Sequence, residues 1–228
     1  GLFIAIKGYL QNGIDYLDSA ISNGAVAAII ENDVDISKLP QTITYIKAGD
    51  TRKALAITNC NLYDNPSKKF KLIGVTGTKG KTTTTFMIKS LLEEHGLKVG
   101  LIGSIAIYIG KEKLEDTDRT TPESDEIQEY FAKMVEEGCR YVVMEVSSQS
   151  YLMHRVDGLF FDYGIFLNIS NDHIGPNEHA SFEEYLYYKK QLLKNCRTAL
   201  VNRDDPHFDA IVEGATAEIL TFSLEQAA

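Results

Sequence analysis

The stretch KLIGVTGTKGKTTTT, residues 71–85, decides the fold because it joins a strand to a helix through a glycine-rich turn. The apolar run 71–75 predicts a buried strand, and residues 81–95 predict a helix that Gly96 ends. Backbone N–H groups of such a turn converge on phosphate oxygens, and the helix N-terminus adds a partial positive charge. The stretch therefore predicts a loop that binds nucleotide phosphates.

The loop departs in one position from the common pattern G-x-x-x-x-G-K-[ST], because Val75 stands where the first glycine belongs. Lys81 would reach the outer phosphates of ATP, and the Thr82 hydroxyl would bind Mg²⁺. A glycine-rich turn with a stray lysine is the alternative, but strand, turn and helix all fall where the motif needs them. We predict that ATP is bound by Gly77, Thr78, Lys79, Gly80, Lys81, Thr82 and Thr83.

Apolar strands alternate with helices along the rest of the chain, which predicts an α/β fold with a mainly parallel sheet covered on both faces. Asp50 is expected to cap the second helix, Pro122 to open the helix that ends near Glu137, and Ser181 with Glu184 to form a capping box. The polar stretch 64–69 predicts a boundary between a small domain, 1–69, and a central domain, 70–228. The expected strands are 2–6, 26–30, 43–47, 71–75, 98–103, 141–146, 163–169, 198–202 and 217–222, and the expected helices 15–23, 51–63, 81–95, 121–137 and 182–193.

The net charge of −9 and the lack of any Lys/Arg-rich block disfavour a nucleic-acid-binding protein. Cys60, Cys139 and Cys196 lie far apart, a spacing that supports neither a zinc site nor a disulfide framework and favours reduced thiols in the cytoplasm. No apolar run has the length of a membrane span, and no signal peptide is visible. Both ends of the sequence look cut, so we expect a fragment.

Four further positions carry chemistry, each with a plainer alternative. Glu145 ends an apolar strand, where a carboxylate faces the ligand crevice of a parallel sheet and suits Mg²⁺, although a solvated acid fits as well. Arg155 would pair with a carboxylate, yet alone it is more often a surface charge. His173 after Asp172 is commonly a surface histidine in a turn. Lys189 lies on a predicted helix, where lysines usually face solvent.

The run GVTGTKGKTT at 74–83 resembles the phosphate loop of the Mur ligase superfamily, which joins amino acids to a nucleotide-linked muramic acid. TTP at 120–122, EVSS at 145–148 and NISNDH at 168–173 follow in the order of that family, and a lysine follows a tyrosine by four residues at 189. The resemblance covers essentially the whole chain. It implies that Thr120, Thr121, Ser147 and Arg155 contact the sugar–peptide substrate and that Glu145 binds Mg²⁺. It also implies that His173 binds a second Mg²⁺ and that Lys189 is a carbamate that binds the same second ion, with Lys190 as the alternative lysine.

The resemblance further implies an ATP-dependent amide ligase of peptidoglycan synthesis. It would add the third amino acid to UDP-N-acetylmuramoyl-L-alanyl-D-glutamate through an acyl phosphate. Residues 1–69 would be the end of a UDP-sugar-binding domain, and a C-terminal domain that chooses the amino acid would be missing, so the fragment alone should not turn over. The run DHIGPNEH at 172–179 favours L-lysine as the added residue, and we expect a monomer.

Two other functions stay open. A folylpolyglutamate-type synthase shares the superfamily but usually carries Gly and then Ser after the loop lysine, where this chain has Thr82 and Thr83. A non-catalytic ATP-binding module is the second alternative. The intact Glu145, His173 and Lys189 argue against it.

Overall fold

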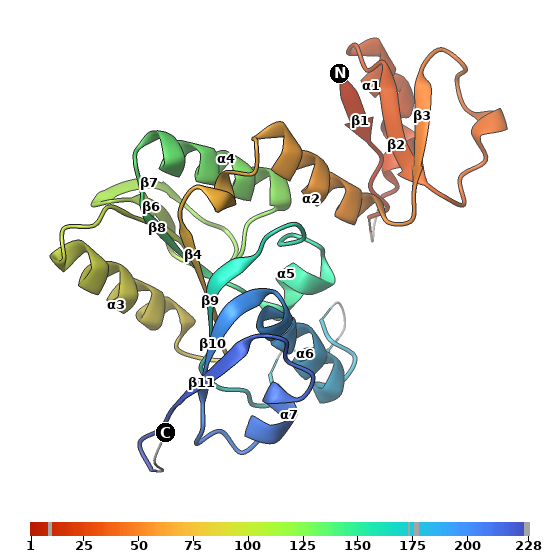
Figure 1. Ribbon diagram of the computed structural model, residues 1–228. Helices are drawn as coiled ribbons and strands as arrows, with labels where there is room; N and C mark the ends of the chain where they lie inside the picture. Colours follow the sequence, from red (N-terminus) through yellow and green to blue (C-terminus); the bar gives the residue numbers. More distant parts are fainter. Residues whose placement is uncertain (9–10, 173, 176–177, 226–228) are drawn as a thin grey trace.

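The computed structural model describes residues 1–8, 11–172, 174–175 and 178–225, and it contains two separate β-sheets (Figure 1). The smaller sheet has the parallel order β1 (Leu2–Ile4), β2 (Ala27–Glu31), β3 (Thr44–Ala48). Where a helix over 15–23 was expected, a 3₁₀ turn at Gly13–Tyr16 leads into α1 (Leu17–Ser22). Apolar side chains from these elements form a core of their own around Leu17, Ala28 and Ile30.

Helix α2 (Thr51–Leu62) joins the small sheet to the rest of the chain. The predicted cap is confirmed, because the Asp50 carboxylate accepts the Lys53 N–H at 2.9 Å. At the same end, the Thr51 N–H and hydroxyl both donate to Glu31 of β2, at 3.0 and 2.7 Å. The flank of α2 packs against α4 (Ser124–Glu136) of the larger unit. The helix is therefore attached to both units.

The larger sheet confirms the predicted α/β fold. Its strand order is β11-β10-β9-β4-β8-β5-β6-β7, and every pair from β11 to β5 is parallel. β4 and β5 follow each other in sequence, but β8 lies between them in the sheet. Parallel strands cannot be joined by a tight hairpin, so helices cross over the sheet to connect them. The strands are β4 (Lys71–Thr76), β5 (Val99–Ile102), β6 (Ala106–Ile109), β7 (Glu112–Asp116), β8 (Tyr141–Glu145), β9 (Phe161–Phe166), β10 (Cys196–Asn202) and β11 (Glu218–Phe222).

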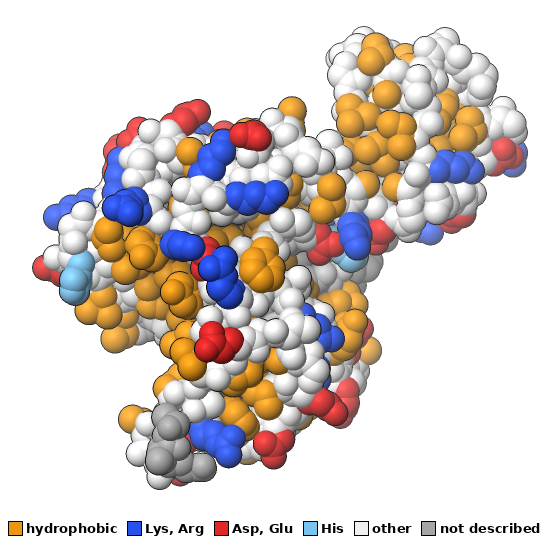
Figure 2. Space-filling view, viewed as in Figure 1, with side chains coloured by type: hydrophobic (Ala, Val, Ile, Leu, Met, Phe, Trp, Pro, Cys, Tyr) orange, Lys and Arg blue, Asp and Glu red, His pale blue; other side chains and the backbone are white. Residues whose placement is uncertain are grey.

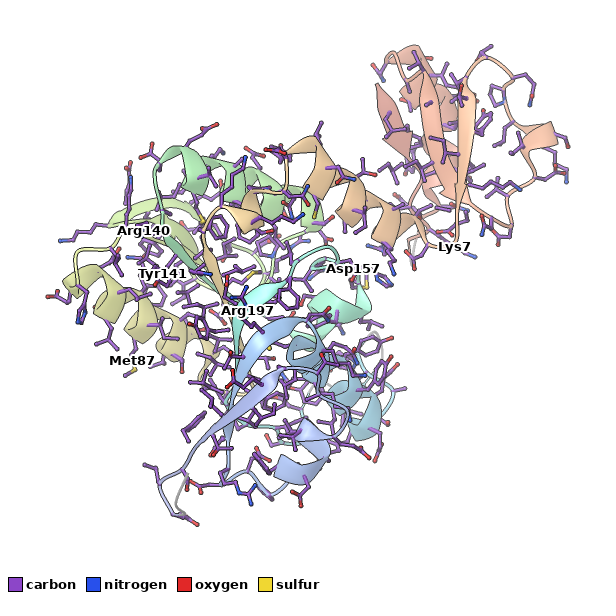
Figure 3. The ribbon with its side chains drawn as sticks, viewed as in Figure 1. Lys7, Met87, Arg140, Tyr141, Asp157 and Arg197 are labelled. Atoms are coloured by element: carbon purple, nitrogen blue, oxygen red, sulfur yellow. The ribbon has the colours of Figure 1, made fainter. Side chains whose placement is uncertain are left out.

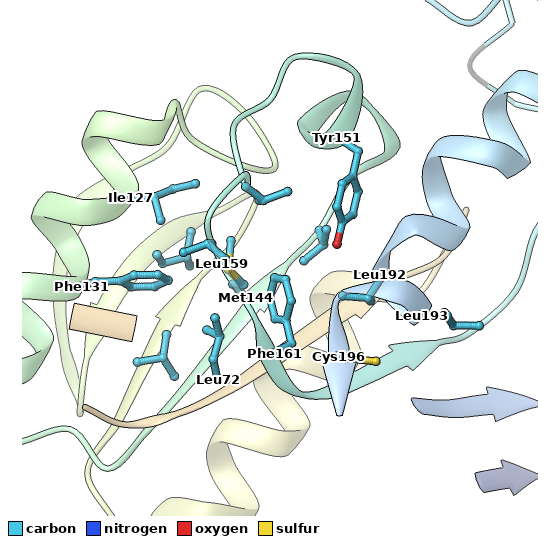
Figure 4. Packing of buried hydrophobic residues seen from close by; sticks show 14 of the residues in the cluster. Leu72, Ile127, Phe131, Met144, Tyr151, Leu159, Phe161, Leu192, Leu193 and Cys196 are labelled. Atoms are coloured by element: carbon cyan, nitrogen blue, oxygen red, sulfur yellow. The ribbon is translucent and has the colours of Figure 1, made fainter. Parts of the chain in front are cut away.

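Helices cover both faces of this sheet, as the buried strands predict (Figure 1). Strand side chains alternate between the faces, so Leu72 packs in the core under α4, whereas Ile73 packs against α3 (Lys81–Glu94) on the opposite face. The face of Leu72 also receives α5 (Ser148–Leu152), the 3₁₀ turn Lys190–Lys194 and α7 (Phe208–Val212). Figure 4 shows Phe161 of β9 among the side chains of this larger core. Tyr185 of α6 (Phe182–Lys189) belongs to the same core.

Three details of the prediction are wrong or incomplete. α4 begins at Ser124, not at Pro122, because the Glu123 side chain caps the helix and the Glu126 carboxylate returns to the Glu123 N–H at 2.8 Å. The Ser181–Glu184 box is half formed, since Glu184 accepts the N–H of Ala180 instead of that of Ser181. The antiparallel strands β6 and β7 and the short α5 were not foreseen.

Exposed apolar side chains gather over α3 in the view of Figure 2. Met87 and Leu91, one turn apart on α3, are both more than half exposed, and Met87 lies on the outer side of the helix (Figure 3). Among the helices of the described residues, none combines the length and apolar character needed to cross a bilayer.

The packing of the hydrophobic core can be tested at two adjacent phenylalanines. Phe161 is completely buried and Phe160 is 56% exposed. Phe161→Ala removes a ring from the close-packed core, so we expect the free energy of unfolding to fall by about 3–5 kcal/mol. Phe160→Ala, the matched control, should change it by less than about 1 kcal/mol. Urea unfolding followed by circular dichroism measures both, and equal losses would contradict the described packing.

Candidate active site

The predicted phosphate loop lies between the carboxyl end of β4 and the first turn of α3. Gly80 caps α3 with φ 86°, a left-handed conformation that suits glycine. The first backbone bond of the helix runs from the Thr84 N–H to Gly80 O at 3.0 Å. The N–H groups of Lys81, Thr82 and Thr83 therefore have no acceptor within the helix and are available to an anion.

The loop is fixed by the segment that follows β9. The Asn168 side chain accepts the Lys79 N–H at 3.0 Å and donates to Lys79 O at 3.2 Å, and Asn168 O accepts the Thr78 N–H at 3.0 Å. A Cβ at Gly77 would lie 3.0 Å from the Leu167 Cβ, so the close approach of the two segments favours glycine there. The sequence indicated a histidine in this segment, but Asn168 as the residue that holds the loop was missed.

Lys81 turns its ammonium back onto the loop, where Nζ donates to Gly77 O at 2.9 Å and to Thr78 O at 3.3 Å. Burial lowers the pKa of Lys81, while the negative charges of Glu145 and Asp172 act in the opposite direction. Lys81 is thus a partly buried cation at the point where the triphosphate would enter.

Glu145, the last residue of β8, is fully buried. Its carboxylate accepts the Ser104 N–H at 2.9 Å and the Ser104 hydroxyl at 3.0 Å. A Cβ at Gly103 would lie 2.6 Å from Glu145 Oε1, so only glycine leaves room for the carboxylate beside the end of β5. Sequence reasoning did not identify Ser104, although a Gly-Ser pair directly after a buried strand was the available signal.

The two predicted threonines lie against the end of β8. The buried Thr121 hydroxyl donates to Glu145 O at 3.0 Å and accepts the Ser147 N–H at 3.1 Å. Thr120 Oγ1 lies 3.1 Å from the Ser104 hydroxyl. Ser147 Oγ accepts the Ser150 N–H at 3.1 Å and so caps α5. The TTP segment, β5 and β8 are therefore joined directly by hydrogen bonds.

Lys189, the last residue of α6, is buried instead of solvated, with 2% of its surface exposed. Nζ lies 4.6 Å from the centre of the Tyr185 ring, and the Tyr185 hydroxyl lies 3.1 Å from Thr78 Oγ1 of the loop. Burial first, and the positive charge of Lys81 second, lower the pKa of Lys189 to about 7, with Asp172 opposing them. A neutral amine is thus well populated at neutral pH.

His173 lies outside the described residues, as do two other positions of the 172–179 run. Asp172, next to it, is exposed, and its charge acts on both Lys81 and Lys189. Further along, His179 is fully buried, and its Nε2 lies 2.8 Å from the Ser148 hydroxyl. Within the described residues, no group of three or more His, Cys, Asp and Glu side chains is placed to hold a metal ion.

The loop lysine Lys81, the two threonines of the TTP segment and Lys189 all line one cavity of about 270 Å³. Of the described residues that line it, four are basic and none is acidic, although the chain as a whole carries a net charge of −9. A concave site with this lining concentrates positive potential and attracts an anionic ligand. Its lining residues are Lys81, Arg119, Thr120, Thr121, Ser147, Ser148, Gln149, Arg155 and Lys189.

Comparison with known proteins identifies the family of the chain. The chain is 45% identical over 231 residues to UDP-N-acetylmuramoyl-L-alanyl-D-glutamate--2,6-diaminopimelate ligase 1 of Clostridium acetobutylicum, covering all of this chain and 46% of that protein. It is 39% identical over 199 residues to the corresponding L-lysine ligase of Streptococcus pneumoniae, covering 87% of this chain and 40% of that protein.

A solved structure of a UDP-N-acetylmuramoyl-L-alanyl-D-glutamate--2,6-diaminopimelate ligase superimposes with a TM-score of 0.81 at 25% identity, over all of this chain and 46% of that one. The chain thus spans about half the length of the relatives it matches. The family model of the Mur ligase middle domain matches residues 75–228. The chain therefore belongs to the Mur ligase family.

Proposed function

We propose that this chain is part of an ATP-dependent amide ligase that adds the third amino acid to UDP-N-acetylmuramoyl-L-alanyl-D-glutamate. One observation carries the proposal. Lys81 of the phosphate loop, the threonines of the TTP segment and the buried Lys189 line the same cavity, so a nucleotide and an acidic substrate would meet there. The names of the two relatives support this choice of substrate.

ATP would bind with its phosphates at the start of α3, where the free N–H groups and Lys81 lie. Residues 77–83 would form this binding site. Mg²⁺ prefers hard oxygen ligands and is commonly held by one or two carboxylates together with substrate phosphates. The Thr82 hydroxyl and the buried Glu145 carboxylate fit that requirement, and His173 is proposed as a further ligand. When bound, Mg²⁺ would offset the negative charge of the triphosphate.

In the proposed reaction, a carboxylate oxygen of the substrate's D-glutamyl residue attacks the γ-phosphorus of ATP. The bond from that phosphorus to the β–γ bridging oxygen breaks, which yields ADP and an acyl phosphate. The amine of the incoming amino acid then displaces phosphate, and an amide forms with loss of a proton. The protein supplies positioning and positive charge, chiefly through Lys81. Thr120, Thr121, Ser147 and Arg155 are proposed to hold the acidic end of the substrate.

Lys189 is proposed to react with CO₂. Its neutral amine forms an N–C bond and loses a proton, and the resulting carbamate is a second anionic ligand for Mg²⁺. Burial and the low pKa support this role, because a protonated amine is not nucleophilic. Lys190 is less buried, and its Nζ has partners of its own: it donates to Ala210 O at 3.2 Å and lies 3.6 Å from the Glu213 carboxylate.

We propose the division of the chain at residue 69, with residues 1–69 belonging to a UDP-sugar-binding domain and residues 70–228 forming the central ATP-binding domain. The amino acid would be chosen by a part of the protein beyond these residues. Because the more similar relative is named a diaminopimelate ligase and the L-lysine ligase is less similar, we propose 2,6-diaminopimelate ahead of the L-lysine that the 172–179 run favoured.

The proposed activity can be tested by an assay of the complete protein. We expect phosphate release from ATP when UDP-N-acetylmuramoyl-L-alanyl-D-glutamate and 2,6-diaminopimelate are both present, and a new amide in the product by mass spectrometry. Lys81→Ala should lower the turnover by about 10²–10³-fold, because a group that stabilises transferring charge is lost. Glutamate addition to a folate would instead establish the folylpolyglutamate-type alternative.

A second experiment tests the carbamate. Lys189→Ala in the complete protein should abolish turnover, and high formate or chloride should restore part of it by supplying the missing anion. Lys190→Ala is the matched control and should keep turnover close to that of the unsubstituted protein. Full activity of Lys189→Ala without added anion would show that the carbamate proposal is wrong. Loss of activity in Lys190→Ala with rescue by formate would move the role to Lys190.

A further inference from the structure

Two arginines of the cavity share one carboxylate oxygen. Arg119 Nη1 lies 2.7 Å and Arg155 Nη2 2.9 Å from the same Oε1 of Glu123. Guanidinium groups keep their charge at every accessible pH, so two of them repel each other at this separation. The negative charge of Glu123 offsets that repulsion and keeps the two planar groups side by side.

Both arginines retain donors for a ligand. Arg155 Nη1 donates to Thr121 O at 3.2 Å, whereas its buried Nε has no hydrogen-bond partner among the described residues. A buried N–H group without an acceptor is costly, and it indicates that an acceptor is added when the site is filled. Arg119 is held from its other side by Asp118, at 3.0 Å from Nε and 3.1 Å from Nη2, which leaves one N–H on each terminal nitrogen.

The arrangement suits a carboxylate. Lys81 and Lys189 are one pair of basic groups in the cavity, near the phosphate loop, and the charge of Lys81 acts on Lys189. Arg119 and Arg155 form a second pair, which Glu123 joins. Planar guanidinium groups pair with carboxylates in bidentate fashion, which fixes orientation as well as charge. A glutamyl substrate brings two carboxylates, and only one of them is to reach the γ-phosphate.

We propose that Arg119 joins Arg155 in binding the non-reacting carboxylate of the substrate's glutamyl residue, with Glu123 as the residue that positions both. This inference rests on the proposed function and assigns a role to two residues, Arg119 and Glu123, beyond the substrate-binding set already proposed. By holding one carboxylate against the arginine pair, the site determines which carboxylate is left to attack ATP.

The test pairs a protein change with a substrate change in the complete protein. Arg119→Ala should raise KM for the nucleotide-sugar dipeptide by about 10–100-fold, the loss expected for a charge-assisted hydrogen bond, with KM for ATP unchanged. The unsubstituted protein should lose a similar factor with an analogue whose non-reacting carboxylate is a carboxamide. Arg119→Ala should lose little more with that analogue, because the two changes remove the same interaction.

Two variants separate positioning by Glu123 from its role as a helix cap. Glu123→Gln keeps an oxygen that can cap α4 but loses the charge, so it should raise KM for the dipeptide, and Glu123→Asp should recover part of the affinity. Glu126→Ala breaks the other half of the capping box, and within the described residues its carboxylate forms no ion pair with either arginine, so it should change KM for the dipeptide much less than Glu123→Gln does. Arg197→Ala, on β10 at the amino end of the sheet, controls for loss of an exposed positive charge (Figure 3).

The outcomes are separable. Additive effects of Arg119→Ala and the carboxamide, or a KM for the dipeptide that Arg119→Ala leaves unchanged while the protein turns over, would overturn the inference and leave the ligase proposal intact. If the unsubstituted protein turns over the nucleotide-sugar dipeptide with neither 2,6-diaminopimelate nor L-lysine, the proposed function is overturned, and this inference with it.

Discussion

The structure depends on one constraint: charged groups are buried around the carboxyl ends of parallel strands. Lys189 and Glu145 are both buried, and Lys81 is partly so. Removing such groups from water is costly unless partners or a change of protonation compensate. Glu145 is compensated by two hydrogen bonds from Ser104, whereas Lys189 has the Tyr185 ring beside it and responds with a lowered pKa.

The parallel sheet supplies the rigidity that holds these groups. β4 ends in the phosphate loop, β8 in Glu145, and the segment after β9 in Asn168, and these strands are adjacent. Side-chain hydrogen bonds then join the strand ends, from Asn168 to the loop and from Thr121 to β8. The site is therefore fixed before any ligand arrives, which reduces the entropy cost of bringing reacting groups together.

Sequence reasoning identified what local patterns encode. The loop 71–85, the cap at Asp50 and the burial of the central strands follow from neighbouring residues, and the structure agrees with them. β7 was missed because its five residues are all exposed and carry no apolar alternation, and Gly110 with φ 58° before it was the available turn signal. Pro122 was misplaced as the start of the helix because Glu123, the next residue, caps α4 in a capping box with Glu126.

The site residues, too, could be predicted from the sequence only where they belong to a local pattern. Lys81 and Thr82 belong to a contiguous motif, whereas Ser104 and Asn168 gain their roles from segments far apart in sequence, and Glu123 brings Arg119 and Arg155 together. The burial of Lys189 shows the same limit: on its helix alone a lysine is expected to face solvent, and only the packing of α6 against the rest of the unit places it inside. Its amine is also the group whose pKa burial and the charge of Lys81 lower to about 7.

The pKa of Lys189 therefore tests the account most directly. Proton titration of ¹⁵N-labelled lysine side chains by NMR, in CO₂-free buffer and with Lys189→Met to assign the signal, measures it. The account predicts a midpoint near 7, where burial and the charge of Lys81 place it. A midpoint at the ordinary value of 10.5 would mean that the amine is solvated or paired, and it would contradict the burial on which the proposed carbamate chemistry depends.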